Sequence, residues 1–286
     1  MIKVLAPAKV NLTLEVLSKR PDGYNEIRSV IQAVGLCDEL NFELSQNIEI
    51  EADMPGWIPE ESLASKVVGL LQEVTGSSRG AAIEVKKRIP LVSGLGGDSS
   101  NAAAILHGLN KLWKLGLSQK KLHDLAAQLG SDVSFFLYGG TALAEGRGEK
   151  LTPLPPLPHM WIILVVPRVP RLQGKTKQLY AGLKPGDYTD GKFTERFIAE
   201  LKAGKQIGSA LLFNVFENVV FTRFPEIDVY RERMEKVHAD NVHLAGSGPT
   251  LFSIVDKKSQ AEELYTRLKQ QGLETYMTET LSALDH

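Results

Sequence analysis

The sequence has very little cysteine, since Cys37 is the one thiol among 286 residues. A single thiol excludes an internal disulfide and a zinc site that needs several cysteines. The residues around Cys37 are small or apolar, so we expect it to pack in the interior as a small apolar side chain. Long apolar runs are lacking as well. The longest, Met160 to Val166, is far shorter than the roughly 20 residues of a membrane-spanning helix.

The sequence also lacks an excess of one charge. It has 33 Lys and Arg against 34 Asp and Glu, which gives a formal net charge of -1. Proteins that bind nucleic acid usually carry a basic surface, so the composition disfavours such a partner. The first residues, Met1 to Val4, lack the basic segment and long apolar run of a signal peptide. We therefore expect a cytoplasmic protein, monomer or homodimer, without a nucleic-acid or membrane partner.

Alternating polarity predicts strands, and longer segments between them predict helices. Leu12, Leu14 and Val16 alternate with polar residues at 11, 13 and 15, which indicates a half-buried strand. The run from Met160 to Val166 ends at Pro167 and suits a strand buried on both faces. Four helices are expected: one capped by Ser100 and stopped at Gly116, one capped by Ser118 and running towards Gly130, one over Asp228 to His238, and one over Ser259 to Gly272.

The proline-rich segment from Thr152 to Pro158 cannot form regular helix or a central strand. It predicts either a linker or a surface loop inside one domain. Strands mixed with separate helices indicate an α+β protein. We divide the chain at the linker into domains of residues 1–153 and 154–286.

One glycine-rich segment has the order that a phosphate-binding loop requires. It follows a predicted strand, contains several glycines and then two serines, and opens a helix. Glycines let backbone N–H groups approach an anion, and the helix start adds unpaired N–H groups. No Gly-Lys-Ser/Thr follows, so this is not the P-loop pattern, and a plain structural turn stays the alternative. The candidate nucleotide-binding residues are Pro90, Gly94, Leu95, Gly96, Gly97, Asp98, Ser99 and Ser100.

Three further segments could carry chemistry. Lys9 lies between Ala8 and Val10 on the first strand, where a buried ammonium needs a partner; the alternative is an exposed lysine. Asp132 follows a predicted helix and could be reactive or could be an N-cap or turn residue. The loop Gly246-Ser247-Gly248 could support a phosphate with its amides or could simply turn the chain.

Taken together, these segments resemble the GHMP kinases. The family order is an N-terminal Pro7-Ala8-Lys9, a central Gly94-Leu95-Gly96-Gly97-Asp98-Ser99-Ser100, and a late Gly246-Ser247-Gly248-Pro249. Arg20-Pro21-Asp22-Gly23-Tyr24 and Ala144-Glu145-Gly146-Arg147-Gly148-Glu149 look like the branch that acts on a cytidine-diphosphate-linked methylerythritol. The resemblance covers most of the chain from residue 2 to about residue 255 and is thin between 170 and 210.

The resemblance implies a fold and a reaction. The expected fold is a two-domain GHMP kinase, with an N-terminal domain like ribosomal protein S5 domain 2 and a C-terminal ferredoxin-like domain. The expected reaction moves the γ-phosphate of ATP, with Mg²⁺, onto the 2-hydroxyl of the cytidyl substrate, a step towards isoprenoids. The metal ligands stay unassigned. The implied residues are Lys9 and Asp132 for catalysis, and Asn11, Tyr24, Asn25 and Tyr180 for the substrate.

The sequence departs from the family pattern at three positions. Asp98 stands where the family usually has Gly, Asn25 where it has His, and Ser62 where it has Asn. A carboxylate at position 98 faces phosphate charge unless it turns outward or helps to hold Mg²⁺. Asp98 and Asn25 favour the alternative of a nucleotide-binding regulator without turnover. Two further alternatives are a kinase for another alcohol such as mevalonate or homoserine, which the run Arg20-Pro21-Asp22-Gly23-Tyr24 argues against, and an RNA-binding protein, which the net charge disfavours.

Overall fold

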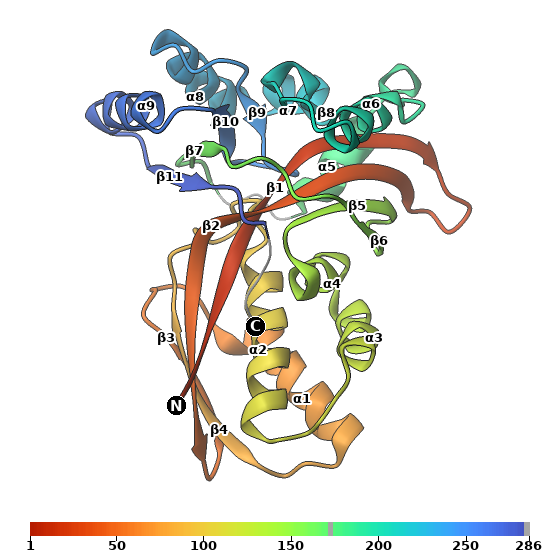
Figure 1. Ribbon diagram of the computed structural model, residues 1–286, viewed down its shortest axis with the longest axis vertical. Coiled ribbons are helices and arrows are strands. Elements are labelled where there is room, and N and C mark those ends of the chain that lie inside the picture. The colour runs from red at the N-terminus through yellow and green to blue at the C-terminus, as the bar shows by residue number, and fades with distance from the viewer. Residues whose placement is uncertain (171–173, 283–286) are drawn as a thin grey trace.

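The computed structural model describes residues 1–170 and 174–282, which form two β-sheets with helices packed on them (Figure 1). The larger sheet has the strand order β3-β4-β2-β1-β8, and β5 and β6 branch from β2. Helices α1 to α4 cover one face of this sheet (Figure 1). The strands are β1 (Ile2–Lys19), β2 (Asn25–Ser45), β3 (Ile48–Ala52), β4 (Gly80–Lys86), β5 (Thr141–Gly146), β6 (Lys150–Pro153) and β8 (Phe213–Asn214), and the helices are α1 (Leu63–Thr75), α2 (Gly97–Leu112), α3 (Gln119–Leu129) and α4 (Ser131–Tyr138).

The smaller sheet is antiparallel throughout and has the order β11-β7-β10-β9. Its strands are β7 (Trp161–Val165), β9 (His243–Leu244), β10 (Leu251–Val255) and β11 (Thr275–Glu279). The helices of this half are α5 (Lys175–Gly182), α6 (Lys192–Lys202), α7 (Glu217–Arg223), α8 (Pro225–Lys236) and α9 (Lys258–Gln270), and short 3-10 turns lie at Pro59–Glu61, Pro185–Asp187 and Ser209–Leu211. The predicted α+β class is confirmed.

The first strand connects the two halves of the molecule. It pairs with β2 along most of its length and with β8 at Thr13 and Leu14, and it runs from beside α2 to the region of α5 and α6 (Figure 1). Val10 and Leu12 pack in a core cluster that includes Leu164 and Phe252 of the smaller sheet. Because side chains alternate along a strand, Lys9 and Asn11 project to the opposite side.

The prediction that this strand is half-buried was wrong. Asn11, Thr13 and Glu15 are as well buried as the apolar residues between them. Helix α6 covers this side of the strand, where the Thr13 and Thr194 hydroxyls lie 2.9 Å apart and the Thr194 N–H donates to Glu15 Oε2 at 2.8 Å. Hydrogen bonds from another element thus allow polar side chains to be buried on both faces.

All four predicted helices are present, as α2, α3, α8 and α9, but the predicted start of α2 differs from the structure. Ser118 caps α3 as predicted, because its hydroxyl accepts from the Lys121 N–H. The prediction that Ser100 caps α2 was wrong. The helix begins at Gly97, after Gly96 in the left-handed region at φ 76°, and the Ser100 N–H already donates to the Gly96 carbonyl at 2.9 Å. Ser99 and Ser100 therefore both lie inside the first turn of α2.

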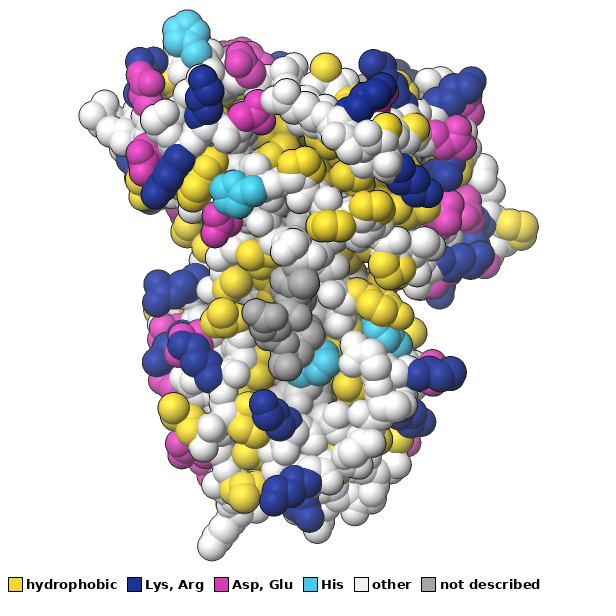
Figure 2. Space-filling view, in the orientation of Figure 1, with side chains coloured by type: hydrophobic (Ala, Val, Ile, Leu, Met, Phe, Trp, Pro, Cys, Tyr) yellow, Lys and Arg dark blue, Asp and Glu magenta, His cyan; other side chains and the backbone are white. Residues whose placement is uncertain are grey.

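The proline-rich segment starts as an edge strand and continues without regular structure. Pro153 ends β6, which pairs with β5 alone, and residues 154–160 have no regular secondary structure. The apolar run at 160–166 forms β7, a buried strand as predicted. Across residues 1–170 and 174–282, no helix combines the length and apolarity needed to cross a membrane. On the face drawn in Figure 2, basic and acidic side chains are interspersed.

Candidate active site

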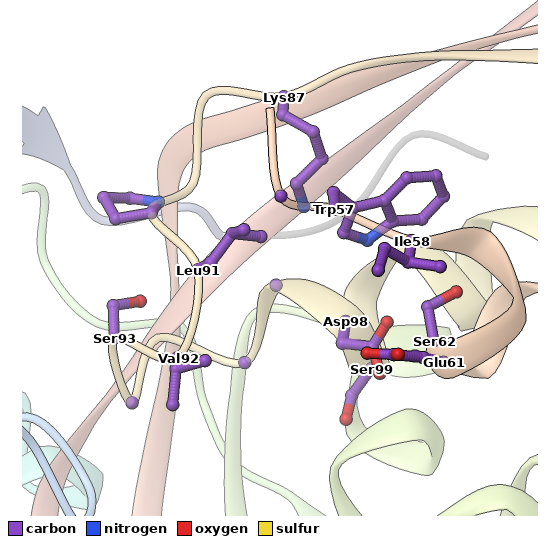
Figure 3. A pocket seen from close by; sticks show the side chains of 15 residues that line it. Trp57, Ile58, Glu61, Ser62, Lys87, Leu91, Val92, Ser93, Asp98 and Ser99 are labelled. Atoms are coloured by element: carbon purple, nitrogen blue, oxygen red, sulfur yellow. The ribbon is translucent and has the colours of Figure 1, made fainter. Parts of the chain in front are cut away.

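The glycine-rich segment forms one wall of a cavity of about 300 Å³ at the start of α2 (Figure 3). The segment leads from β4 into α2, which confirms the predicted order of strand, glycines and helix. The opposite wall comes from the segment before α1 and from the end of β4. Its residues Trp57, Ile58 and Lys87 escaped the sequence analysis because they belong to no glycine or serine pattern. The full lining is Gly56, Trp57, Ile58, Glu61, Ser62, Lys87, Pro90, Leu91, Val92, Ser93, Gly94, Gly96, Gly97, Asp98 and Ser99.

Two of the glycines are required by close approach as well as by backbone conformation. Gly94 has φ 86°, and a Cβ there would lie 2.6 Å from the Ala245 carbonyl oxygen and 2.8 Å from that of Gly248. Gly96 has φ 76°, and its Cβ would lie 2.9 Å from the Phe136 ring. Larger residues at either position would push the loop away from its neighbours. The loop is thus fixed between α4 and the Gly246-Ser247-Gly248 loop.

The first turn of α2 brings the Ser99 side chain and backbone N–H groups to the cavity, and Ser100 follows directly behind. The Ser100 hydroxyl is buried and has no hydrogen-bond partner among the described residues, and Ser99 lines the cavity. A buried hydroxyl without a partner is costly unless a ligand supplies one. The 16-residue helix α2 adds the unpaired N–H groups of its first turn. This combination suits an anion with several oxygens.

Asp98 turns towards α1 and away from the glycine-rich loop. Its two carboxylate oxygens accept from the Leu63 N–H at 3.2 and 3.3 Å, next to the N-cap Ser62 (Figure 3). The side chain keeps an exposed surface, and burial raises its pKa, while the hydrogen bond from the Leu63 N–H opposes this shift. The partial positive charge at the start of α1 thus offsets part of the cost of burying the carboxylate.

Lys9 and Asp132 form an ion pair beside the glycine-rich loop. Lys9 Nζ lies 3.8 Å from Asp132 Oδ2 and donates to Asn11 Oδ1 at 2.7 Å. Only 6% of Lys9 is exposed, so the alternative of a surface lysine is wrong. The Asn11 amide donates in turn to Ser29 Oγ at 2.8 Å, which places Asn11 behind the ammonium. Asp132 lies in the first turn of α4 with 42% of its side chain exposed, so a ligand can reach it.

The Gly246-Ser247-Gly248 loop lies against Lys9 from the smaller sheet. A Cβ on Gly246, at φ 58°, would come within 3.1 Å of Lys9 Nζ. The buried Asn214 amide donates to the Leu244 and Gly246 carbonyls at 2.8 Å each, and Asn214 belongs to β8, which pairs with β1. The register of β8 against β1 therefore sets where this loop lies relative to Lys9.

A second, larger cavity of about 800 Å³ is lined in part by Gly130 and Ser131, which directly precede Asp132. Tyr24, Asn25 and Tyr180, which come from distant parts of the sequence, all line it. Tyr180 packs edge-on against Phe216 with ring centroids 4.9 Å apart, and burial together with the Asp132 charge raises its pKa to about 12. The full lining is Lys19, Gly23, Tyr24, Asn25, Ala127, Gln128, Leu129, Gly130, Ser131, Arg147, Glu149, Thr176, Lys177, Tyr180, Ala181 and Tyr188.

The sequence analysis missed several residues of this second cavity. Tyr188 and Lys19 lie outside every motif, and Arg147 was noticed only as part of the run around it. The Arg147 guanidinium carbon lies 4.8 Å from the centroid of the Tyr24 ring. The signal in the sequence was the pair of glycines on either side of Arg147, Gly146 and Gly148. Both have positive φ and place Arg147 at the tip of a tight turn.

Lys9 and Asp132 thus lie close to both cavities. A Cβ on Gly96 of the first cavity would meet the Lys9 side chain at 3.2 Å, and Ser131 of the second cavity directly precedes Asp132. The residues described at 1–170 and 174–282 contain no group of three His, Cys, Asp or Glu placed to hold a metal ion. The arrangement can hold a polyphosphate in the first cavity and an aromatic, anionic molecule in the second. A carboxylate and a buried ammonium lie close to both.

Comparisons with known proteins agree with this geometry. A family model for the GHMP kinases N terminal domain matches residues 62–140, and one for the GHMP kinases C terminal matches residues 195–273. A 4-diphosphocytidyl-2-C-methyl-D-erythritol kinase of Dehalococcoides mccartyi is 48% identical over 285 residues, 100% of both chains. A kinase of the same name from Shouchella clausii is 40% identical over 269 residues, 93% of this chain and 90% of its own.

Solved structures show the same relationship. One of a 4-(cytidine 5'-diphospho)-2C-methyl-D-erythritol kinase has a TM-score of 0.83 and 32% identity and covers 98% of this chain and 99% of its own. The homoserine kinase of Cytophaga hutchinsonii, at 20% identity, TM-score 0.73 and coverage of 99% and 95%, shares the fold. The expected two-domain GHMP kinase fold is confirmed. The chain belongs to the GHMP kinases, which are ATP-dependent phosphotransferases, and within them to the 4-diphosphocytidyl-2-C-methyl-D-erythritol kinase family.

Proposed function

We propose that this chain transfers the γ-phosphate of ATP to the 2-hydroxyl of 4-diphosphocytidyl-2-C-methyl-D-erythritol, a step of the methylerythritol phosphate pathway of isoprenoid biosynthesis. One observation carries the proposal: the Lys9–Asp132 ion pair lies next to Gly96 of the glycine-lined cavity and next to Ser131 of the cavity that has Tyr24, Asn25 and Tyr180 on its walls. The names of the relatives in Dehalococcoides mccartyi and Shouchella clausii support the same substrate.

Asp132 acts as the general base in this proposal. An alcohol is a weak nucleophile at neutral pH, so a carboxylate within hydrogen-bond reach of its proton increases its reactivity. Lys9 lies 3.8 Å from Asp132 Oδ2 and is held by Asn11, so its charge is fixed in place before the substrate binds. A fixed cation stabilises both the carboxylate and the negative charge that develops on the attacking oxygen.

The glycine-rich loop and the first turn of α2 hold the triphosphate. Gly94 to Gly97 offer backbone N–H groups, and the free Ser100 hydroxyl gains a phosphate or metal partner. The Gly246-Ser247-Gly248 loop supports the phosphates from the opposite side. Trp57 and Ile58 give the far end of the cavity an apolar wall, which suits the nucleoside.

The residues present fit a magnesium ion bound mainly through the nucleotide. Mg²⁺ is commonly held by one or two protein oxygens together with substrate phosphates and water. Ser99 and Ser100 are the protein oxygens best placed for it at the start of α2. When bound, the ion neutralises charge that builds up on the transferring phosphoryl group.

The second cavity binds the cytidine. A pyrimidine base stacks well on a tyrosine ring, and stacking is worth about 1–3 kcal/mol per base. Tyr24 and Tyr180 supply rings, and the Asn25 amide offers both a donor and an acceptor to the base edge. Asn25 can thus replace the family histidine without loss of pairing capacity.

The proposal leaves four expectations as predictions. They are a cytoplasmic location, a monomer or homodimer, the lack of a nucleic-acid or membrane partner, and a domain division at residues 153 and 154. The ion pair of Lys9 and Asp132 at 3.8 Å supports an enzyme over the alternative of a regulator without turnover.

A coupled assay of ADP release tests the proposed function. The purified chain is incubated with ATP, Mg²⁺ and one alcohol at a time: the cytidyl compound, mevalonate or homoserine. We expect kcat/KM for the cytidyl compound to exceed that of the other two by at least about a hundredfold. Preferential turnover of mevalonate or homoserine contradicts the proposed substrate. If none of the three alcohols causes ADP release, the proposed activity is contradicted.

A further inference from the structure

We propose that Arg147 recognises the diphosphate of the cytidyl substrate while it stacks on Tyr24, the ring that receives the base. This inference rests on the proposed function and adds a specificity-determining residue to it. The observation behind it is a juxtaposition at the mouth of the 800 Å³ cavity, where the Arg147 guanidinium lies 4.8 Å from the Tyr24 ring centroid.

The backbone that carries Arg147 is held firmly. Gly146 at φ 75° and Gly148 at φ 101° form the turn between β5 and β6, and the Gly148 N–H donates to the Glu145 carbonyl at 3.1 Å. Glu149 accepts from the Arg147 N–H at 2.5 Å, and Glu26 of β2 accepts from the Gly146 N–H at 3.1 Å. The turn therefore presents Arg147 at one fixed point above the cavity.

Asp22 feels the charge of Arg147 but is itself paired with Arg20, so most of the Arg147 charge is available to a ligand. No ion pair among residues 1–170 and 174–282 includes its guanidinium, which is exposed and contacts the Tyr24 ring. Glu149, the carboxylate on the cavity wall, already accepts from the Arg147 backbone. Lys19 and Lys177 also line the cavity, so its basic side chains outnumber its single carboxylate. A molecule with at least two negative charges suits this wall.

The geometry assigns the two parts of the substrate to two neighbouring groups. Tyr24 is 56% exposed although Arg147 covers one of its faces, so the other face is free to stack on a base. A guanidinium binds phosphate oxygens through two parallel N–H groups, which an ammonium cannot do. Because base and diphosphate are joined by one ribose, a cation next to the stacking ring can reach the phosphates.

Binding measurements separate recognition of the phosphates from recognition of the base. Isothermal titration calorimetry is carried out with cytidine and with CDP, in the presence of a saturating non-hydrolysable ATP analogue that occupies the other cavity. The proteins are wild type, Arg147→Gln, Arg147→Lys and, as a matched loss of one surface charge outside the cavity, Arg168→Gln. Arg147 is exposed, so these variants are expected to fold.

We expect Arg147→Gln to weaken CDP binding about tenfold or more and cytidine binding at most about threefold, since charge-assisted bonds to phosphate are lost. Arg147→Lys should lose less, and Arg168→Gln should match wild type. In turnover, Arg147→Gln should raise KM for the cytidyl compound with kcat changed less than about twofold.

Two results would overturn the inference. Unchanged CDP affinity in Arg147→Gln means that the guanidinium does not contact the diphosphate. Equal losses for cytidine and CDP mean that Arg147 only supports the Tyr24 ring. In both cases wild type still turns over the cytidyl compound, so the proposed function stands. A wild-type protein that binds neither ligand and phosphorylates another alcohol overturns both proposals.

Discussion

The two cavities near Asp132, which we propose for ATP (the nucleotide cavity) and for the cytidyl substrate (the cytidyl cavity), are built in different ways. The nucleotide cavity takes most of its wall from one continuous segment, residues 90–99, and uses backbone groups. The cytidyl cavity is assembled from four distant segments, at 19–25, 127–131, 147–149 and 176–188, and uses side chains. Backbone binding demands particular conformations, so it tolerates few residue types. Side-chain binding demands only that suitable groups meet in space, so it tolerates exchange.

The largest effect is expected at Asp132, the carboxylate that both cavities share in the proposed reaction. Asp132→Asn should lower kcat by about 10² to 10⁴, because it removes the base and leaves both cavities intact. The KM for ATP should change less than about twofold. Asp124→Asn, an exposed aspartate of α3 paired with Lys120, is the matched control and should behave as wild type. An Asp132→Asn enzyme with more than half of the wild-type kcat would show that another group takes the proton.

A methyl group added to the backbone-built cavity should have the next largest effect. In Gly94→Ala the new Cβ meets the Ala245 and Gly248 carbonyl oxygens at 2.6 and 2.8 Å, and φ 86° is unfavourable for alanine. We expect KM for ATP to rise about tenfold or more. Gly76→Ala has a similar φ of 66° with open space around it, so it measures the backbone cost alone. Equal effects of the two changes on ATP binding would mean that contact with the 245–248 loop is unimportant.

The change Asp98→Gly should affect stability more than nucleotide binding. It removes the hydrogen bond to the Leu63 N–H and places a glycine in the first turn of α2, which should lower the free energy of unfolding by about 1–2 kcal/mol. Half-saturating Mg²⁺ should stay within about twofold of wild type. Asp98→Asn keeps an oxygen for Leu63 and should recover most of the stability. A several-fold rise in half-saturating Mg²⁺ for the glycine variant would place Asp98 on the ion instead.

The smallest effect is expected in the side-chain cavity, for Tyr180→Phe. Burial and the Asp132 charge raise the Tyr180 pKa to about 12, while the unfolded chain titrates near its ordinary value of 10. The phenol therefore stabilises the fold below pH 10, and this contribution is lost as the pH rises from 10 towards 12. Urea unfolding at pH 9 and at pH 11 measures the free energy of unfolding. Between these two pH values it should fall by up to about 1 kcal/mol less in the variant than in wild type. Its kcat/KM at pH 7 should stay within about threefold.

Tyr276 provides the matched control for Tyr180. Its pKa is also raised to about 12, through burial and its hydrogen bond to Glu274, and it lies outside the cavity lining. Tyr276→Phe should reproduce part of the alkaline effect without any change in cytidine binding. If Tyr180→Phe follows the same alkaline stability curve as wild type, the phenol is not shielded from water in the way the structure indicates.

The nucleotide cavity was predictable from sequence because its motif is local. Glycine positions, the preceding strand and the following helix stand next to each other in the chain, although Ser100 was assigned to the cap when it belongs to the first turn. The other wall, with Trp57 and Lys87, depends on tertiary packing and left no local signal.

In the cytidyl cavity, the residues predicted from sequence were those found through the family resemblance. Tyr24, Asn25 and Tyr180 were found through the family resemblance, whereas Tyr188 and Lys19 were not, because their meeting depends on how β1, α5 and the turn at 185–187 pack together. The burial of Glu15 escaped notice for the same reason. Its polarity predicts exposure, but helix α6 covers it, and the Thr194 N–H donates to one of its two carboxylate oxygens.

The central claim is that the two cavities hold their ligands so that the γ-phosphate reaches the 2-hydroxyl beside Asp132. Proton-coupled ³¹P NMR of the product from ATP and the cytidyl compound tests it directly. The carbon that bears the 2-hydroxyl carries a methyl group and no hydrogen, so the new phosphomonoester should give a signal without splitting by a neighbouring C–H proton. A doublet or a triplet for the new phosphate would place it on another hydroxyl and contradict the account.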